Sequence, residues 1–174
     1  MKKILIVVDM QKDFIDGALG TKEAQAIVDK AAEKIKSFDG EIVVTFDTHF
    51  ENYMETSEGN KLPVPHCIKG SEGHALYSGI EKALEGKKYT SVEKLTFGST
   101  ELPKVVGNLA KGEMYEIEML GLCTDICVVS NALLLKAFNP EIEITVLSEL
   151  CAGVTPEKHI AALETMRSCQ INVI

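Results

Sequence analysis

The chain has 174 residues, of which 45% are hydrophobic and 25% charged, and its formal net charge is −8. This acidic balance argues against a nucleic-acid partner, which requires basic patches, and no apolar run approaches the ~20 residues of a membrane span. The length and composition are typical of one folded domain with a substantial buried core. We therefore expect a single domain over residues 1–174.

Strand-like and helix-like patterns alternate along the chain. In chain order we expect strand 3–8, helix 21–38, strand 41–46, an irregular segment 47–78, short helix 80–84, strand 89–92, helix 102–109, strand 114–120, helix 128–135, strand 141–147, helix 156–168 and strand 171–174. The irregular segment is longer than an ordinary connection, as functional loops often are. Apolar strands alternating with helices predict an α/β fold, a three-layer sandwich with a central parallel sheet of about six strands.

The cysteines indicate the redox compartment. Their number is odd, and their spacings match neither a disulfide framework nor a zinc site of the CxxC type. Free thiols persist where the surroundings are reducing, so we predict a cytoplasmic protein. Two N-terminal lysines followed by apolar residues resemble the start of a signal peptide, but the apolar run soon meets Asp9, and a first buried strand fits better.

Chemically capable side chains follow four consecutive predicted strands. Asp9 follows the first strand, Asp47 and His49 the second, Lys94 the third and Cys127 the fourth. In parallel α/β sheets, ligands bind beyond the carboxyl ends of the strands. The glycine-rich fingerprints of dinucleotide-binding and phosphate-binding loops are missing from the sequence. We therefore expect these side chains to meet in one site that does not bind a nucleotide cofactor.

Cys127 is the candidate nucleophile, because it is predicted to lie in the first turn of a helix. Unpaired N–H groups and the helix dipole would lower the pKa of its thiol there. Asp9 could accept the thiol proton and pass it to a leaving amine, while Lys94 could stabilise the thiolate. The backbone N–H groups of Cys123 and Cys127 could hold an oxyanion. Each of these side chains also has an ordinary structural explanation when it is considered alone. Cys127 could be a small buried hydrophobic residue, Asp9 a turn cap and Lys94 a solvated surface lysine.

The segment after the second strand carries metal-ligand residue types. Asp47 and His49 are two residues apart at a strand end and can point to one side, and His66 follows in a loop that two prolines stiffen. This mixed set suits one divalent metal ion, Zn²⁺ first, with Mn²⁺ or Fe²⁺ as alternatives. His74 is an alternative to His66, and His159 is assigned to the surface of the last helix. Scattered polar loop residues remain the alternative interpretation.

The order of the candidate residues resembles a known family. Asp9, Lys94 and Cys127 resemble the Asp–Lys–Cys triad of the isochorismatase-like cysteine hydrolases. The D-x-Q-x-D-F segment at 9–14 is similar to the opening motif of that family, and G-L-C-T-D-I-C-V at 121–128 is similar to its nucleophile motif. The similarity spans nearly the whole chain. It implies the Rossmann-like topology of the family and the catalytic roles of its triad.

Two further expectations come from this resemblance alone. In the family, a cis peptide bond precedes the residue that matches Cys123, and the N–H of that residue joins the N–H of the nucleophile in the oxyanion hole. The resemblance therefore implies a cis bond between Leu122 and Cys123. Family members often assemble as dimers or tetramers, which implies a homo-oligomer.

The Asp-x-His…His pattern resembles the metal site of nicotinamidases, the branch that converts nicotinamide to nicotinate. Many nicotinamidases have a third histidine between the two, whereas residues 50–65 contain none. Some members use a glutamate instead. We select Glu58, because the following Gly59 allows the backbone to turn and aim the side chain inward, with Glu55 and Glu51 as rivals.

The substrate pocket is also inferred from this resemblance. Phe14 resembles the residue that stacks on the pyridine ring, although ordinary core packing also explains it. The usual pocket tryptophan is absent because the chain has none, so Leu62 or Val64 would supply that wall.

Together these features predict a metal-assisted cysteine amidohydrolase in NAD salvage. It would convert nicotinamide to nicotinate and ammonia through a thioester, with a small-molecule amide as its partner. The alternatives are a related cysteine hydrolase acting on another small amide, or a non-catalytic member that kept the cleft.

Overall fold

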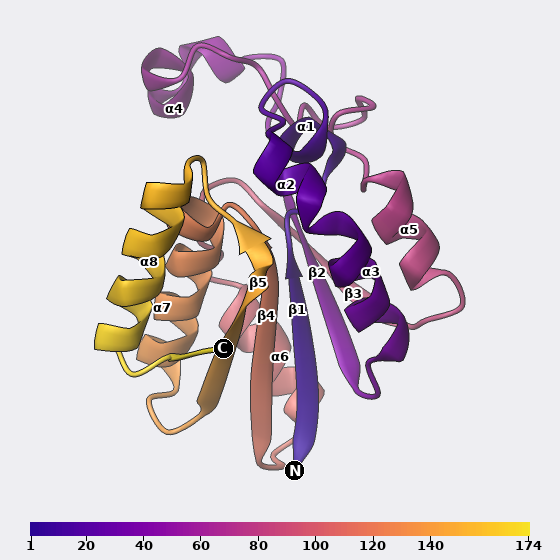
Figure 1. Ribbon diagram of the computed structural model, residues 1–174, viewed down its shortest axis with the longest axis vertical. Coiled ribbons are helices and arrows are strands. Elements are labelled where there is room, and N and C mark those ends of the chain that lie inside the picture. Colours follow the sequence, from indigo (N-terminus) through magenta and orange to yellow (C-terminus); the bar gives the residue numbers. More distant parts are fainter.

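The computed structural model describes residues 1–174 and has one parallel sheet at its centre (Figure 1). Its strands run in the order β3-β2-β1-β4-β5-β6, and every neighbouring pair is parallel. The strands are β1 (Lys2–Val8), β2 (Glu41–Asp47), β3 (Tyr89–Lys94), β4 (Tyr115–Leu122), β5 (Glu143–Ala152) and β6 (Asn172–Val173). The predicted α/β class with a six-stranded parallel sheet is confirmed.

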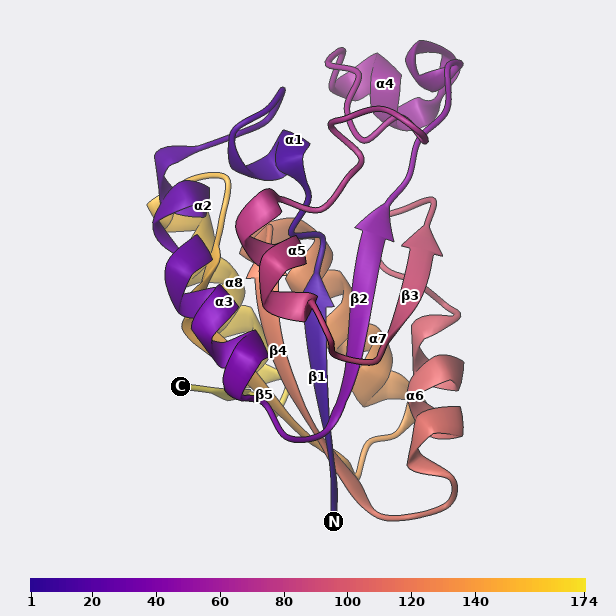
Figure 2. The same ribbon diagram turned by 90° about the vertical axis from the view of Figure 1, so that its right-hand side faces the viewer.

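Helices cover both faces of the sheet and give three layers (Figures 1 and 2). One face carries α2 (Lys22–Ala26), α3 (Val28–Ser37) and α5 (Ser78–Leu84). The opposite face carries α6 (Leu102–Ala110), α7 (Val129–Phe138) and α8 (Pro156–Ser168). None of these helices has the length and apolar character needed to cross a bilayer.

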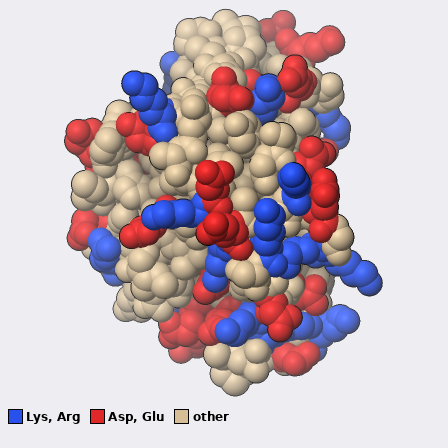
Figure 3. All heavy atoms as spheres, turned by 45° about the vertical axis from the view of Figure 1, so that its right-hand side comes forward, with Lys and Arg blue, Asp and Glu red and all other residues tan.

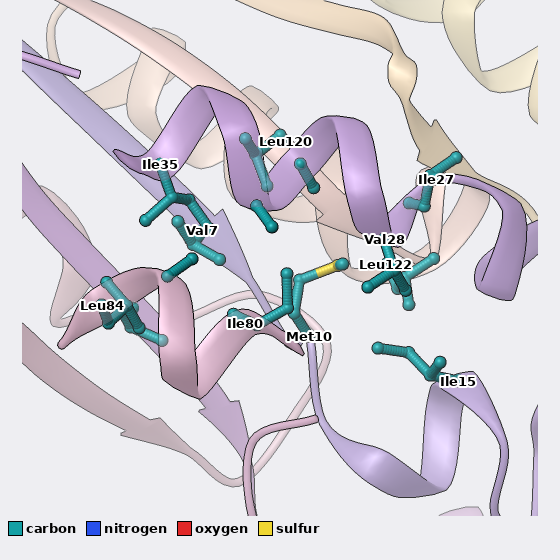
Figure 4. Close-up of a cluster of buried hydrophobic side chains, with 14 of the residues drawn as sticks. Val7, Met10, Ile15, Ile27, Val28, Ile35, Ile80, Leu84, Leu120 and Leu122 are labelled. Atoms are coloured by element: carbon teal, nitrogen blue, oxygen red, sulfur yellow. The ribbon is translucent and has the colours of Figure 1, made fainter. Parts of the chain in front are cut away.

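Alternate residues of the central strands supply two separate apolar cores. Leu5 and Val7 of β1 belong to the core under α3 and α5, whereas Ile4, Ile6 and Val8 belong to the core under α6, α7 and α8. This is the two-residue alternation of strand side chains, and burial on both faces explains the near-continuous apolar strands of the sequence. Figure 4 shows the first core, where Val7 and Leu120 of adjacent strands lie near Ile35 and Ile80.

The surface contributes little to stability by comparison. Acidic and basic side chains are interspersed over the face in Figure 3. Exposed pairs on the protein surface, such as Lys104 with Glu101, form salt bridges. Exposed ion pairs gain little because water already solvates both charges. The two apolar cores therefore stabilise the fold and hold the strand ends in register.

The structure differs from the predicted elements in short segments. The helix expected over 21–38 is divided at Ile27 into α2 and α3. The apolar periodicity continues across this break, so the sequence pattern did not reveal it. Segment 47–78 contains η1 (Tyr53–Glu55) and α4 (Ser57–Lys61), and α1 (Lys12–Ile15) follows β1. None of these short turns is long enough to show a period.

Candidate active site

The carboxyl ends of four strands bring the predicted triad together. In the sheet Asp47 pairs with Lys94 and Val8 pairs with Gly121, so the residues that follow these positions meet at one edge. Figures 1 and 2 both draw α1 and α4 beyond this edge. Asp9, Lys94 and Cys127 are buried here, although 118 positions of sequence separate the first from the last.

The Lys94 ammonium is the centre of the arrangement. Its Nζ lies 2.6 Å from Asp9 Oδ2, 3.0 Å from Asp47 Oδ1 and 3.3 Å from Cys127 Sγ. The fourth contact is a hydrogen bond to the Thr96 carbonyl at 3.3 Å. Burial alone would lower the pKa of Lys94, but the charges of Asp9, Cys127 and Asp47 raise it above its ordinary value. Lys94 therefore stays a cation that contacts the candidate base, the candidate nucleophile and the carboxylate of a candidate metal ligand, Asp47.

Asp9 is held in an unusual backbone conformation, with φ of 47°, which aspartate tolerates better than most residues. Its Oδ1 accepts a hydrogen bond of 2.6 Å from Thr45 Oγ1. Its Oδ2 is ion-paired with Lys94 but makes no hydrogen bond of good geometry, so this oxygen keeps room for a proton. Burial raises the pKa of Asp9 above its ordinary value despite the opposing charge of Lys94, as suits a general base.

The prediction that a helix terminus lowers the pKa of Cys127 is wrong. Burial raises the pKa of this thiol well above its ordinary value, and the nearby charge of Asp9 adds to the effect, which Lys94 only partly opposes. Cys127 lies in η2 (Thr124–Val128), a π-helical turn that precedes α7, and it is buried under the sheet edge. Desolvation therefore outweighs the helix dipole, and the resting site holds a thiol beside a carboxylate and an ammonium.

A cis peptide bond joins Leu122 to Cys123, as the resemblance implies. Immediately before it, Gly121 has φ of 124°, and a Cβ there would lie 2.1 Å from the Val8 carbonyl oxygen. Only glycine allows β4 to approach β1 this closely. The Cys123 carbonyl then accepts hydrogen bonds from Ile126 and Val128 at 3.1 Å each, which starts the turn that carries Cys127.

Two polar residues anchor this turn. His159 lies on the last helix, α8, as predicted, and is partly exposed, but its Nδ1 lies 2.8 Å from Thr124 Oγ1, so its ring packs against the turn. Asn131 on α7 donates to the Cys127 carbonyl at 2.8 Å and to the Phe97 carbonyl at 3.2 Å, and accepts from the Ser99 N–H at 2.9 Å. Asn131 was not among the predicted site residues, although an amide side chain in a largely apolar helix is the signal that could have revealed it.

Four predicted metal ligands meet next to the triad. Asp47 Oδ2 lies 3.1 Å from His49 Nε2 and 3.5 Å from His66 Nε2, and these three atoms lie within 4.8 Å of one another. Glu58 Oε1 lies 3.7 Å from both Nε2 atoms. Burial would raise the pKa of Asp47, but hydrogen bonds from both histidines and the charge of Lys94 hold it well below its ordinary value. The cluster therefore offers two imidazoles and an ionised carboxylate, with Glu58 beside them.

The donor set fits a divalent metal ion. His66 Nδ1 lies 2.8 Å from the Val64 carbonyl oxygen, which can only accept, so Nδ1 carries a proton and Nε2, which faces the cluster, is the nitrogen that would bind a metal ion. Of the three glutamates considered, Glu58 alone faces the cluster, whereas Glu51 and Glu55 are exposed. The role expected of Gly59 is different in the structure: a Cβ there would lie 2.1 Å from the Tyr53 carbonyl oxygen, so Gly59 allows α4 to pack on η1.

Tyr53 supports both imidazoles and was not predicted. Its ring centroid lies 4.8 Å from that of His49 and 5.1 Å from that of His66, both edge-to-face, and its hydroxyl donates to the Leu62 carbonyl at 2.8 Å. Tyr53 lies in the irregular segment, where no sequence pattern distinguishes it. His74, the alternative to His66, lies outside the cluster, with Nε2 2.9 Å from Thr48 Oγ1.

Gln11, the middle residue of the opening motif, holds the backbone of Asp47. Its Oε1 accepts from the Asp47 N–H at 2.8 Å, and its Nε2 donates to the Asp47 carbonyl at 2.9 Å and to the His74 carbonyl at 2.9 Å. The side chain is fully buried. Because the buried Gln11 amide makes all three of these hydrogen bonds, it fixes the end of β2 against the segment that follows β1.

A cavity of about 450 Å³ opens beside the triad and the metal-ligand cluster. Phe14 and Leu62 line it, as does Cys123, but Val64 does not. Unpredicted apolar side chains complete the wall: Leu19, Leu95, Phe97 and Ile126. Phe14 also packs edge-to-face on His66, with centroids 5.5 Å apart. The cavity thus presents an apolar wall, a sulfur and two imidazoles to one small ligand.

Comparisons with known proteins agree with this geometry. The family model described as "Isochorismatase domain" matches residues 3–174. The nicotinamidase/pyrazinamidase of Mycobacterium tuberculosis (strain ATCC 25618 / H37Rv) is 29% identical, over 99% of this chain and 98% of the relative. The crystal structure of nicotinamidase/pyrazinamidase PncA from Bacillus subtilis has a TM-score of 0.84 at 29% identity, covering 99% of each chain. That of the pyrazinamidase of Pyrococcus horikoshii in complex with zinc has a TM-score of 0.81 at 28% identity, covering 100% of this chain and 99% of the other.

Proposed function

Because the chain belongs to the isochorismatase-domain family and is a hydrolase of the nicotinamidase/pyrazinamidase type that acts on an amide, we propose that it converts nicotinamide to nicotinate and ammonia through a thioester on Cys127. The observation that carries the proposal is the position of Lys94 Nζ, within 3.3 Å of the candidate base, the candidate nucleophile and Asp47. One cation there can stabilise negative charge on either the sulfur or the carboxylate as the proton moves between them.

In the acylation half-reaction, Cys127 Sγ attacks the carboxamide carbon and its proton passes to Asp9. The N–H groups of Cys123 and Cys127 hold the oxyanion that forms. When the C–N bond breaks, Asp9 returns the proton to the departing nitrogen, which leaves as ammonia. The products of this half-reaction are a thioester on Cys127 and a carboxylate at Asp9, ready for a second proton transfer.

In the deacylation half-reaction, Asp9 takes a proton from water as the water oxygen attacks the thioester carbon. The C–S bond breaks, Asp9 returns a proton to the sulfur, and the carboxylic acid product releases its remaining proton to solvent as nicotinate. Throughout both steps Lys94 keeps its charge and its position. The raised pKa of the Cys127 thiol is compatible with this route, because deprotonation accompanies attack and does not precede it.

Asp47, His49, His66 and Glu58 would hold one divalent metal ion, Zn²⁺ by preference. When bound, this ion supplies a Lewis-acid contact for the ring nitrogen of the substrate and so a template role. The zinc complex of the Pyrococcus horikoshii pyrazinamidase supports the choice of metal. Phe14 and Leu62 would contact the faces of the ring. The reducing compartment, the place in NAD salvage and the homo-oligomer implied by the resemblance stay predictions.

The test is ammonia release from nicotinamide by Cys127→Ala, with Cys169→Ala as the matched control. Cys169 is exposed and does not line the cavity, so its replacement should leave the rate unchanged, whereas Cys127→Ala should release no ammonia. Acid-quenched wild-type enzyme should carry a nicotinoyl group on the Cys127 peptide in the mass spectrum. If folded Cys127→Ala still turns over nicotinamide, the covalent mechanism is wrong. Activity on a non-pyridine amide with none on nicotinamide would instead favour the related hydrolase.

A further inference from the structure

Thr45 is a polar residue that follows three apolar residues, Ile42, Val43 and Val44, in the interior of a strand. It lies on β2, is fully buried, and pairs with Val8 of β1 and Val92 of β3 in the sheet. Its position is two residues before Asp47, so both side chains point to the same face. A buried hydroxyl needs a hydrogen-bond partner, and the partner of Thr45 is the candidate catalytic base.

The Thr45 hydroxyl bonds Asp9 twice. Oγ1 donates to Asp9 Oδ1 at 2.6 Å and accepts from the Asp9 backbone N–H at 3.2 Å. The same N–H also lies 3.3 Å from the Thr45 carbonyl oxygen. The hydroxyl thus connects the carboxylate of Asp9 to the N–H of the same residue, at a position where φ of 47° has taken the chain out of the strand conformation.

This contact separates the roles of the two carboxylate oxygens. Oδ1 is held by Thr45, whereas Oδ2 is directed at Lys94 Nζ, 2.6 Å away, and forms no hydrogen bond of good geometry. A carboxylate free to rotate about its terminal torsion would exchange these oxygens, because that torsion is broad and nearly two-fold. With Oδ1 fixed, the oxygen that faces Lys94 is the one left to take a proton.

We propose that Thr45 is a positioning residue for amide hydrolysis, which holds Asp9 Oδ1 so that Oδ2 is kept for proton transfer with Cys127 and the leaving nitrogen. The proposal rests on the proposed function, in which Asp9 is the general base. Thr45 does not line the cavity, so it acts through Asp9 and not on the substrate.

The other groups around Asp9 are charged or titratable, and Thr45 is its neutral donor. Lys94 from β3 opposes the rise in the pKa of Asp9 that burial causes, and Asp47 from β2 adds to it. The negative charge of Asp9 in turn helps to raise the pKa of three thiols, those of Cys67, Cys123 and Cys127. Loss of the Thr45 hydroxyl removes one hydrogen bond to the Asp9 carboxylate and leaves all of the surrounding charges in place.

The test compares Thr45→Val, which removes the donor, with Thr45→Ser, which keeps it. Hydrogen bonds to charged groups are strong enough that kcat/KM for nicotinamide should fall about 10- to 100-fold in Thr45→Val. The loss should appear in kcat, with KM within about twofold, because ground-state contacts with the substrate are unchanged. The acid limb of the kcat/KM profile should move to higher pH by about one unit. Thr45→Ser should keep most of the rate and the wild-type acid limb.

Each outcome is decisive. A folded Thr45→Val with kcat/KM and acid limb equal to those of wild type would overturn the proposal, as would equal losses in the valine and serine variants. If Thr45→Val does not fold, Thr45→Cys replaces it: the S–H group is a weak donor, so its acid limb should lie above that of Thr45→Ser, and coincident limbs would overturn the proposal.

A measurement that needs no substrate separates this inference from the proposed function. The rate of Cys127 alkylation by iodoacetamide, followed by peptide mass spectrometry, should decline on the acid side at higher pH in Thr45→Val than in wild type. This shift together with absence of ammonia release by wild type would contradict the proposed substrate and support the Thr45–Asp9 coupling. Ammonia release by wild type with superimposed alkylation profiles would overturn the coupling alone.

Discussion

Replacement of Lys94 by methionine tests the central contact of the site. The Lys94 side chain has no exposed surface, and its ammonium lies 2.6 Å from Asp9 and 3.0 Å from Asp47. Methionine has a similar length and is apolar, so the change removes the charge while keeping much of the volume. Two buried carboxylates then lose their common cation.

The magnitude follows from this geometry. Removing one partner of a buried ion pair costs about 3–5 kcal/mol, because the other charge is left uncompensated. For a domain of this length, 1 kcal/mol lowers the melting temperature by about 2–4 °C, so we expect a decrease of roughly 6–20 °C. We also expect kcat/KM to fall by at least ~10²-fold, since the developing charge on Cys127 loses its electrostatic partner.

The effect on stability should grow with pH. Burial already raises the folded pKa of Asp9 above the ordinary value of 3.8. A carboxyl group with a raised folded pKa contributes stability below that pKa, and this stability is lost as pH rises through it. Without Lys94 the pKa of Asp9 rises further, and Asp47 loses one of the influences that hold its own pKa low. The difference in stability between wild type and variant should therefore be smallest near about pH 4 and increase toward about pH 8.

The assay is urea unfolding followed by far-ultraviolet circular dichroism across this pH range. Lys104→Met is the control, because Lys104 forms an exposed salt bridge with Glu101 and its loss should change stability by less than about 0.5 kcal/mol. The double variant with Asp9→Asn should recover part of the stability lost in Lys94→Met but none of the activity. A loss below about 1 kcal/mol that does not depend on pH, or a double variant no more stable than the single one, would refute the reasoning.

Two further substitutions test the approach of β4 to β1 and the role of Glu58 as a metal ligand. Gly121→Ala should destabilise the protein by at least about 3 kcal/mol in urea unfolding, because its Cβ would lie 2.1 Å from the Val8 carbonyl oxygen. Gly107→Ala is the control: a Cβ there meets nothing within 4 Å, so this change should stabilise helix α6 by about 0.5–1 kcal/mol. Equal effects of the two substitutions would contradict the close approach of β4 to β1. Glu58→Gln should weaken Zn²⁺ binding about 10- to 100-fold in equilibrium dialysis, and Glu55→Gln should not; unchanged binding in Glu58→Gln would remove Glu58 from the ligand set.

The sequence by itself determined where the chemistry lies along the fold. Strand and helix periods reflect local backbone conformation and burial, and a parallel sheet places all of its strand ends at one edge. That is sufficient to bring Asp9, Asp47, Lys94 and Cys127 together, and the structure places them there. The resemblance to a family added the cis bond before Cys123, which the structure also has.

The tertiary structure alone decided which neighbours these residues have and how their protons are held. The contact between Thr45 and Asp9 joins positions 36 residues apart, and Tyr53 packs on two histidines from a segment without periodicity. The raised pKa of the Cys127 thiol likewise depends on how completely the fold removes water from it, and a helix position does not report that. Sequence patterns record the face on which a side chain lies, whereas hydrogen bonding and desolvation depend on the atoms that other segments bring against it.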